Sequence, residues 1–289
     1  MSINQSTNQP SPLHNSQFII HNSLFPSPNY QSPITNPQPT RFLAYNLWFG
    51  GRDKEEAIYE VLAHCDADFV GLTEADDPVV VAGLARRLGM SHIWAEGSGE
   101  RHIAALSRLP IGRWQVYNKP PLTQAVLEVT LDIEPPLTVY VVHLLPYLLL
   151  PFEVRRWQAV GKLLEVIREG QVGRHLLLGD FNCVAPGDRV LQERNPEKMR
   201  RVMRWQLGYI PRWAMPRLLK AGYVDCFRHL HPDEDGFTWW TINPTTRYDY
   251  VLASAELLPS LLSCRVVDDH PAIPQASDHF PLSAEFNFQ

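Results

Sequence analysis

The residues best suited to chemistry lie in HLLLGDFNCVAPGD, residues 175–188. An apolar run ends at Gly179, and Asp180, Phe181 and Asn182 follow at the point where a strand would leave the core. Because strand side chains alternate between two faces, Asp180 and Asn182 are expected to point the same way while Phe181 points inward. Asp and Asn are also common turn residues, so this segment alone fits either a catalytic pair or a turn.

Polar residues stand at or beside the ends of five other apolar runs. They are Asn46 in RFLAYNLWFGG, Glu74 in DFVGLTEAD, His143 in VYVVHL, Arg247 and Asp249 in RYDYVLAS, and Asp278 and His279 in QASDHFPL. Carboxylates hold a hard cation through oxygen, amides orient phosphate oxygens, and histidine donates protons or hydrogen bonds. If these residues converge, the set is what metal-assisted phosphoester chemistry needs.

These motifs, in this order from Arg41 to Phe286, resemble the endonuclease/exonuclease/phosphatase superfamily. Its fold is shared by DNase I, exonuclease III-type AP endonucleases, neutral sphingomyelinases and inositol polyphosphate 5-phosphatases. The resemblance implies an α/β (α+β) architecture, the four-layer α/β/β/α sandwich of DNase I-like proteins. It also implies that the active site lies where the strand ends meet.

The resemblance assigns a role to each motif. Glu74 is implied to be a metal ligand, with a helix-capping or salt-bridged Glu as the alternative, and Asp278 an additional ligand. Asn46 would orient the metal or the scissile phosphate. Asp180 would position or deprotonate the attacking water, and Asn182 would contact a phosphate oxygen.

Three further residues carry the rest of the expected catalysis. Asp249 and His279 match the family's Asp-His pair, in which the carboxylate fixes the imidazole tautomer and favours the charged ring. His143 matches the strand-end His of the DNase I and sphingomyelinase branches, where it is placed to protonate the leaving oxygen. Residues 222–240 instead resemble the segment that precedes the Arg-x-Asp motif of AP endonucleases, so the chain mixes the signatures of two branches.

Substrate contacts are expected from three side chains. Arg247 opens the Arg-x-Asp motif, and Trp239 could stack on a base or sugar, although packing is the commoner role of such aromatics. Arg108 could reach a phosphate or pair with a surface acid.

The spacing of apolar residues predicts how these motifs are positioned. Helices are expected after an Asp53 cap, after an Asp77 cap with Pro78 in the first turn, and over residues 153–169. Strands are expected at 41–46, 68–73, 102–107, 125–132, 137–143, 174–180, 248–253 and 280–286.

The chain divides into an expected tail and one catalytic domain. Residues 1–40 contain no Lys, Arg, Asp or Glu, and 25 of them are Ser, Asn, Pro or Gln, so this segment is predicted to be a disordered tail. Residues 41–289 form the predicted domain, with a basic helical insertion at 188–222.

Composition narrows the class further. The 289 residues carry a formal charge of −5, which disfavours a protein that coats nucleic acid nonspecifically. The four cysteines are scattered without metal-site spacing, so free thiols are expected. The chain contains no apolar run of the length that spans a bilayer, and a cytoplasmic location is predicted.

The insertion and a nearby loop leave the substrate open. Residues 188–222 hold nine Lys or Arg against three acidic residues, together with Trp205, Tyr209 and Trp213. The loop LLPYLLLPF, residues 144–152, is almost entirely apolar. This combination fits a nucleic-acid backbone, peripheral contact with an anionic membrane, or simple packing of the insertion on the body.

The sequence thus predicts a divalent-metal phosphoesterase that uses Mg²⁺, with Mn²⁺ possible, and hydrolyses phosphodiester bonds in a nuclease-like manner. A phospholipid phosphodiesterase and a sugar or inositol phosphatase are the alternatives within that chemistry. The non-enzyme alternative is a catalytically inactive binding module. No obligate protein partner is evident, and endo or exo action stays open.

Overall fold

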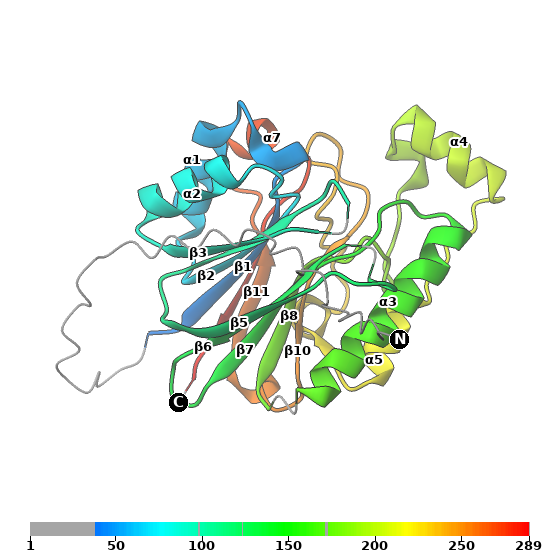
Figure 1. Cartoon of the computed structure of the whole chain (residues 1–289). Helices are drawn as coiled ribbons and strands as arrows, with labels where there is room; N and C mark the ends of the chain where they lie inside the picture. Colours follow the sequence, from blue (N-terminus) through cyan, green and yellow to red (C-terminus); the bar gives the residue numbers. More distant parts are fainter. Residues whose placement is uncertain (1–37, 98, 123, 171–172, 289) are drawn as a thin grey trace, which may run out of the picture.

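Two six-stranded sheets form the centre of the molecule (Figure 1). The computed structural model describes residues 38–97, 99–122, 124–170 and 173–288. The first sheet has the order β11-β12-β1-β2-β4-β3 and the second β5-β6-β7-β8-β10-β9. The first comprises β1 (Thr40–Asn46), β2 (Phe69–Thr73), β3 (Ser91–Ala95), β4 (Ile103–Ser107), β11 (Leu261–Val266) and β12 (Leu282–Phe286). The second comprises β5 (Ile111–Tyr117), β6 (Val126–Leu131), β7 (Leu137–His143), β8 (His175–Asp180), β9 (Val224–Asp225) and β10 (Asp249–Ala253).

Helices cover the outer face of each sheet (Figure 1). The first sheet packs against α1 (Glu55–Cys65), α2 (Pro78–Leu88) and α7 (Ile273–Ala276) through one apolar cluster. The second packs against α3 (Leu150–Glu169) and α5 (Ala214–Lys220) through another. A third cluster fills the space between the sheets and includes residues of the short helix α6 (Cys226–Leu230). The predicted four-layer α/β/β/α sandwich is therefore confirmed.

Each sheet contains one parallel pair at its centre, and these pairs position the site. β1 runs parallel to β2, and β7 runs parallel to β8. Parallel neighbours end at the same edge, so the polar residues that end β1 and β2, or β7 and β8, emerge together. The register confirms this, because Asn46 lies opposite Thr73 and His143 lies opposite Asp180.

The predicted helix starts have mixed outcomes. Asp77 caps α2 as expected, its side chain accepting from the backbone N–H of Val79. The Asp53 cap is wrong: α1 is preceded by Lys54 without a side-chain cap, and Asp53 has a left-handed φ of 63°. α3 begins at Leu150, earlier than expected, because Pro151 fits the first turn of a helix.

The predicted insertion, residues 188–222, contains α5, which packs on the second sheet, and a second helix that extends from the body. Met199 and Met203 of α4 (Glu197–Trp205) pack with Leu148 and Tyr248 and so attach this helix to the body. Figure 1 shows α4 set apart beyond α3. Trp205 is 81% exposed and Leu207 96% exposed, so these two side chains do not pack on the body.

The remaining expectations concern cysteines, the tail and membrane spans. All four cysteines are buried and free, as predicted. Residues 1–37 of the predicted tail lie outside the described residues, and β1 begins at Thr40, just inside the predicted boundary. Among the helices that the structure describes, none combines the length and apolar character needed to cross a bilayer.

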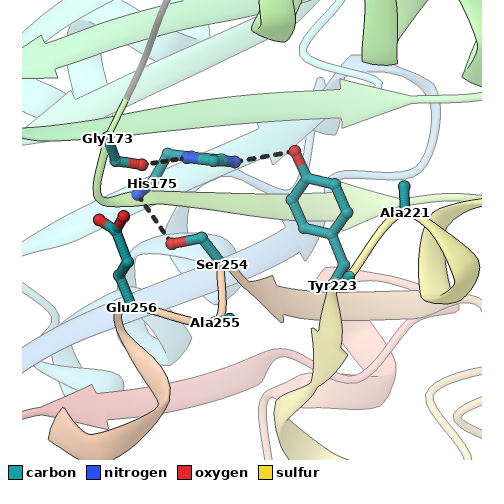
Figure 2. A pocket seen from close by; sticks show the side chains of 8 residues that line it. Gly173, His175, Ala221, Tyr223, Ser254, Ala255 and Glu256 are labelled. Carbon is teal, nitrogen blue, oxygen red and sulfur yellow. Dashed lines mark hydrogen bonds between the residues drawn. The ribbon is translucent and has the colours of Figure 1, made fainter.

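The start of β8 carries a buried polar cluster at the opposite edge from the strand ends (Figure 2). His175 Nε2 lies 2.8 Å from the hydroxyl of Tyr223, and Nδ1 hydrogen-bonds to the carbonyl of Gly173. Its backbone N–H donates to Ser254 Oγ at 3.3 Å. These residues line a pocket of about 260 Å³.

Candidate active site

The predicted polar residues meet where the ends of the two central parallel pairs face each other. Asn46 Nδ2, from the first sheet, donates to Asp180 Oδ2 of the second at 3.0 Å. Asp249 lies opposite Asp180 in the β8–β10 register. The hydrogen bond from Asn46 to Asp180 thus joins the two sheets at this edge.

Asp180 and Asn182 show features of both expectations for their segment, a catalytic pair and a turn. Asp180 is buried at the end of β8 and its Oδ1 accepts from the backbone N–H of Asn182 at 2.9 Å, which is a turn contact. The strand does not continue, because Asn182 has a φ of 48° and its Nδ2 donates to the carbonyl of Leu144. Phe181 points inward as expected and is fully buried against Tyr250.

Asp249 and His279 form the expected pair. Asp249 Oδ2 lies 2.7 Å from His279 Nδ1. Burial lowers the pKa of His279, but the carboxylates around it, Asp249 foremost, raise that pKa to about 10. Charged imidazolium beside carboxylate is therefore the favoured state of the pair.

His143 and Asp180 form the most unusual contact of the site. His143 Nε2 lies 3.8 Å from Asp180 Oδ2, and neither ring nitrogen has a hydrogen-bond partner within the described residues. Burial lowers the pKa of His143 to about 4, so its ring is neutral at physiological pH. Burial and the neighbouring carboxylate of Asp249 raise the pKa of Asp180 to about 8.

Glu74 and Asp278 flank this group. Glu74 has a φ of 50° just beyond β2, and its Oε2 accepts from the N–H of Phe49 at 2.9 Å. Burial raises the pKa of Glu74, but His143 and this N–H contribute to a net lowering. Burial raises the pKa of Asp278, whose Oδ2 accepts from Trp239 Nε1 at 3.1 Å.

The donor set fits a hard divalent cation. Ligand atoms of Asp180, Asp249 and His279 all lie within 4.8 Å of one another, and Asp249 Oδ1 is buried without a partner in the described part of the chain. A buried carboxylate oxygen without a partner is costly, and a cation would supply one. This tightest cluster differs from the predicted ligands Glu74 and Asp278, which lie beside it.

Two residues that sequence reasoning did not assign shape the site. Arg101 pairs with Asp76 at 2.6 Å and reaches Glu74 at 3.7 Å, so it supports the predicted metal ligand. The start of β4 pairs with the end of β2, so residues just before β4 lie beside Glu74. An expected antiparallel pairing of these two strands would have indicated Arg101. Ser277 donates to the carbonyl of Asn46 at 2.7 Å and accepts from the N–H of His279. It therefore joins the end of β1 to the segment that precedes β12.

The predicted substrate contact of Arg247 is wrong, and of the two expectations for Arg108 the structure shows pairing with a surface acid. Arg247 is fully buried, and its guanidinium is bound by Asp188 and Asp225, so it stabilises the fold beneath the site. Arg108 follows the far end of β4 and pairs with Asp66 at 2.8 Å, on the opposite edge from Glu74.

Trp239 does lie at the site. Its indole contacts Tyr248 as well as donating to Asp278, and its backbone forms a bridge with His279. It is partly exposed, so packing and substrate contact are both open to it.

Comparisons with known proteins agree with this geometry. The model of the Endonuclease/Exonuclease/phosphatase family matches residues 43–279, and the chain belongs to this family. The curated relatives include the DNA repair nuclease APEX1 of Danio rerio, 30% identical over 118 residues that cover 37% of this chain and 34% of that protein. Exodeoxyribonuclease III of Haemophilus influenzae is 29% identical over 121 residues, 38% of this chain and 45% of that protein. The chain thus spans between a third and a half of these two curated relatives.

Solved structures share the fold over almost the whole domain. The 3′ phosphatase NExo from Neisseria, solved with a product DNA hairpin, has a TM-score of 0.67 and 22% identity. An AP endonuclease from Archaeoglobus fulgidus has a TM-score of 0.67 and 17% identity. Each covers 86% of this chain and 100% of the other chain. This likeness establishes the DNase I-like sandwich.

Proposed function

We propose that this protein is a divalent-metal-dependent hydrolase of phosphodiester bonds in nucleic acid. The observation that carries the proposal is the convergence of Asn46, Asp180 and His143 with the Asp249–His279 pair at one sheet edge. Buried groups without partners, such as both nitrogens of His143, are costly unless a ligand satisfies them. This argues against an inactive binding module that has lost its chemistry.

The chain's own residues divide the reaction between them. Asp180, whose ionised form a bound cation would favour, would accept a proton from the attacking water, and Asn46 holds that carboxyl group in position. His279 is fixed through Nδ1 by Asp249, so its Nε2 can stabilise negative charge developing on the phosphate. His143, which is neutral, is placed to donate a hydrogen bond to the leaving oxygen.

Magnesium is the proposed cation, with manganese as the alternative. Glu74 and Asp278 would hold it together with Asp180 and Asp249, the two carboxylates of the cluster whose ligand atoms lie within 4.8 Å of one another. When bound, it would act as a Lewis acid that neutralises phosphate charge. Arg101, which lies 3.7 Å from Glu74, would orient that ligand.

Nucleic acid is the proposed substrate because of the relatives' own described activities. They are a DNA repair nuclease, an exodeoxyribonuclease and a 3′ phosphatase bound to DNA. Phospholipid head groups are the second candidate, because the exposed Trp205 and Leu207 lie at the end of α4, a helix that carries several arginines. The cytoplasm is the proposed location, and the four free thiols are consistent with a reducing compartment.

The test is hydrolysis of a substrate panel by the full chain. DNA duplexes with an abasic site, a 3′ phosphate or a recessed 3′ end would be compared with phosphatidylcholine and sphingomyelin vesicles, in Mg²⁺ and in EDTA. We expect cleavage of DNA that EDTA abolishes and that His143→Gln reduces by at least about 10²-fold. The exposed variant Arg155→Gln is the matched control. Cleavage of lipid alone would overturn the proposed substrate.

A further inference from the structure

A second pocket lies on the outer face of the second sheet, away from the residues described above. It has a volume of about 450 Å³ and is lined by residues of α3, of α5 and of the segment before α5. Figure 1 shows α3 and α5 on the same face of the second sheet. Its lining residues are Trp157, Arg212, Trp213, Pro216, Arg217 and Lys220.

The charges of this pocket all have one sign. Three cations and no carboxylate line it, and Arg212, Arg217 and Lys220 form no ion pair among the residues described. Arg212 donates to the backbone carbonyls of Ala185 and Asp188, so its position is fixed but its charge is not neutralised by a side chain. The pocket therefore attracts an anion, and carboxylate repulsion does not oppose binding there.

Two partly exposed indole rings lie beside these cations, Trp157 at 43% and Trp213 at 41% exposure. The guanidinium of Arg217 lies over the Trp157 ring, 4.0 Å from its centre, and therefore covers one face of that ring. Exposed aromatic surface next to cations without carboxylate partners is the combination that binds nucleotides, because bases stack on the rings and phosphates contact the charges.

The position of Arg217 depends on a glycine. A Cβ at Gly161, in the middle of α3, would lie 2.6–2.7 Å from the guanidinium atoms of Arg217. Glycine destabilises a helix relative to alanine, and here it leaves the space that the Arg217 guanidinium occupies. Arg217 Nη1 also donates to the carbonyl of Trp157 at 2.8 Å. The guanidinium is thereby held against the helix.

We propose that this pocket binds one nucleotide of a single-stranded segment of the substrate, with the base on an indole and its phosphate at Arg217 and Lys220. The inference rests on the proposed function, because it concerns the same nucleic-acid substrate at a second site. No residue that lines the pocket belongs to the catalytic edge, so a short phosphodiester held at that edge would not depend on the pocket.

The test measures binding and catalysis separately. Binding of oligothymidylate to the full chain would be followed in EDTA, with thymidine 5′-monophosphate and inorganic phosphate as smaller probes. Hydrolysis of bis-p-nitrophenyl phosphate with Mg²⁺ would report the catalytic edge alone. Trp157→Ala is expected to weaken oligothymidylate binding at least about fivefold and to leave this hydrolysis unchanged.

Two other variants protect the test against a folding defect. Lys220→Gln removes an exposed charge, and Gly161→Ala displaces Arg217 without removing any charge; both should weaken oligothymidylate binding. The matched controls are Trp205→Ala and Lys198→Gln, which lie on α4 outside the pocket and should bind normally.

The outcomes distinguish this inference from the proposed function. Pocket-dependent binding in a protein that hydrolyses no phosphodiester supports the inference and refutes only the catalytic proposal. Hydrolysis with oligothymidylate binding that is equal in wild type, Trp157→Ala and Lys220→Gln overturns the inference. Binding to anionic vesicles that requires Trp205, without oligothymidylate binding, would also overturn it by identifying a membrane surface instead.

Discussion

Two buried histidines at opposite ends of the second sheet differ in their partners. His143 ends β7, and neither ring nitrogen has a hydrogen-bond partner in the described part of the structure. His175 begins β8, and both its ring nitrogens are hydrogen-bonded, to Gly173 and Tyr223 (Figure 2). Burial lowers the pKa of both rings, so burial and the direction of the pKa shift do not separate them.

The two environments differ in whether the ring nitrogens find hydrogen-bond partners within the protein. Around His175, every ring hydrogen bond is made within the protein, so the group stabilises the fold and has no capacity left for a ligand. Around His143, carboxylates crowd together and Asp249 Oδ1 also lacks a partner. The state of the two ring nitrogens therefore distinguishes His143 from His175: those of His143 lack partners, and those of His175 have them.

The largest expected effect concerns a buried polar group that, like His175, has its partners within the protein. Arg247→Met should lower the free energy of unfolding by about 3–5 kcal/mol, because it leaves Asp225 buried without its guanidinium partner. Urea denaturation would measure the loss. Arg189→Met removes an exposed pair with Asp235 and should cost less than about 1 kcal/mol. Equal losses in the two variants would contradict the structural role of Arg247.

A substitution at Asp180, beside His143, should lower the reaction rate rather than the stability. Asp180→Asn is expected to lower kcat by at least about 10²-fold, the usual effect of losing a general base. Its melting temperature should not fall, because burial and repulsion from Asp249 outweigh the attraction of the His279 imidazolium for the ionised Asp180 carboxylate. Steady-state kinetics and thermal melting of this variant and of Asp235→Asn would decide. A fully active Asp180→Asn would reduce Asp180 to a turn residue.

The two histidines can be compared directly by the same substitution. His175→Phe leaves the hydroxyl of Tyr223 without its partner and should cost about 1–3 kcal/mol of stability, with kcat unchanged. His143→Phe should keep or raise stability, because it removes two unsatisfied nitrogens, while activity falls. Chemical denaturation and kinetics of both variants are needed. The reverse pattern would break the distinction between the two edges.

The smallest expected effect concerns the cation. Glu74→Gln should raise the Mg²⁺ concentration for half-maximal activity by about tenfold, since ligand environments commonly change affinity by that order. Glu60→Gln, on the exposed side of α1, is the control. An unchanged Mg²⁺ titration would assign the ligands to Asp180 and Asp249 and their neighbours instead.

The central strands were predictable from sequence, and the edge strands were not. The strands that went unpredicted, β3, β5, β9 and β11, are the edge strands of the two sheets. β5 and β11 are mostly exposed or half-buried, so they lack the continuous apolar runs that mark β1, β7 and β8. Burial on both faces creates the signal, and an edge strand does not have it.

The site residues were predictable as types at strand ends, but their partners were not. Nothing local distinguishes Arg247 from a substrate contact, because Asp188 and Asp225 are supplied by distant segments. Arg101 was missed for the same reason, since its role depends on β4 pairing with β2. Periodicity locates side chains on an element, whereas their roles depend on contacts between elements.

The contact between Ser277 and the carbonyl of Asn46 has a consequence for biosynthesis. β1 pairs with β12, and Asn46 meets Asp180 only when both sheets are assembled. A chain still emerging from the ribosome lacks Ser277, His279 and the strand that should lie beside β1. This edge of the molecule is therefore assembled only after the segment from Ser277 through β12 has been translated.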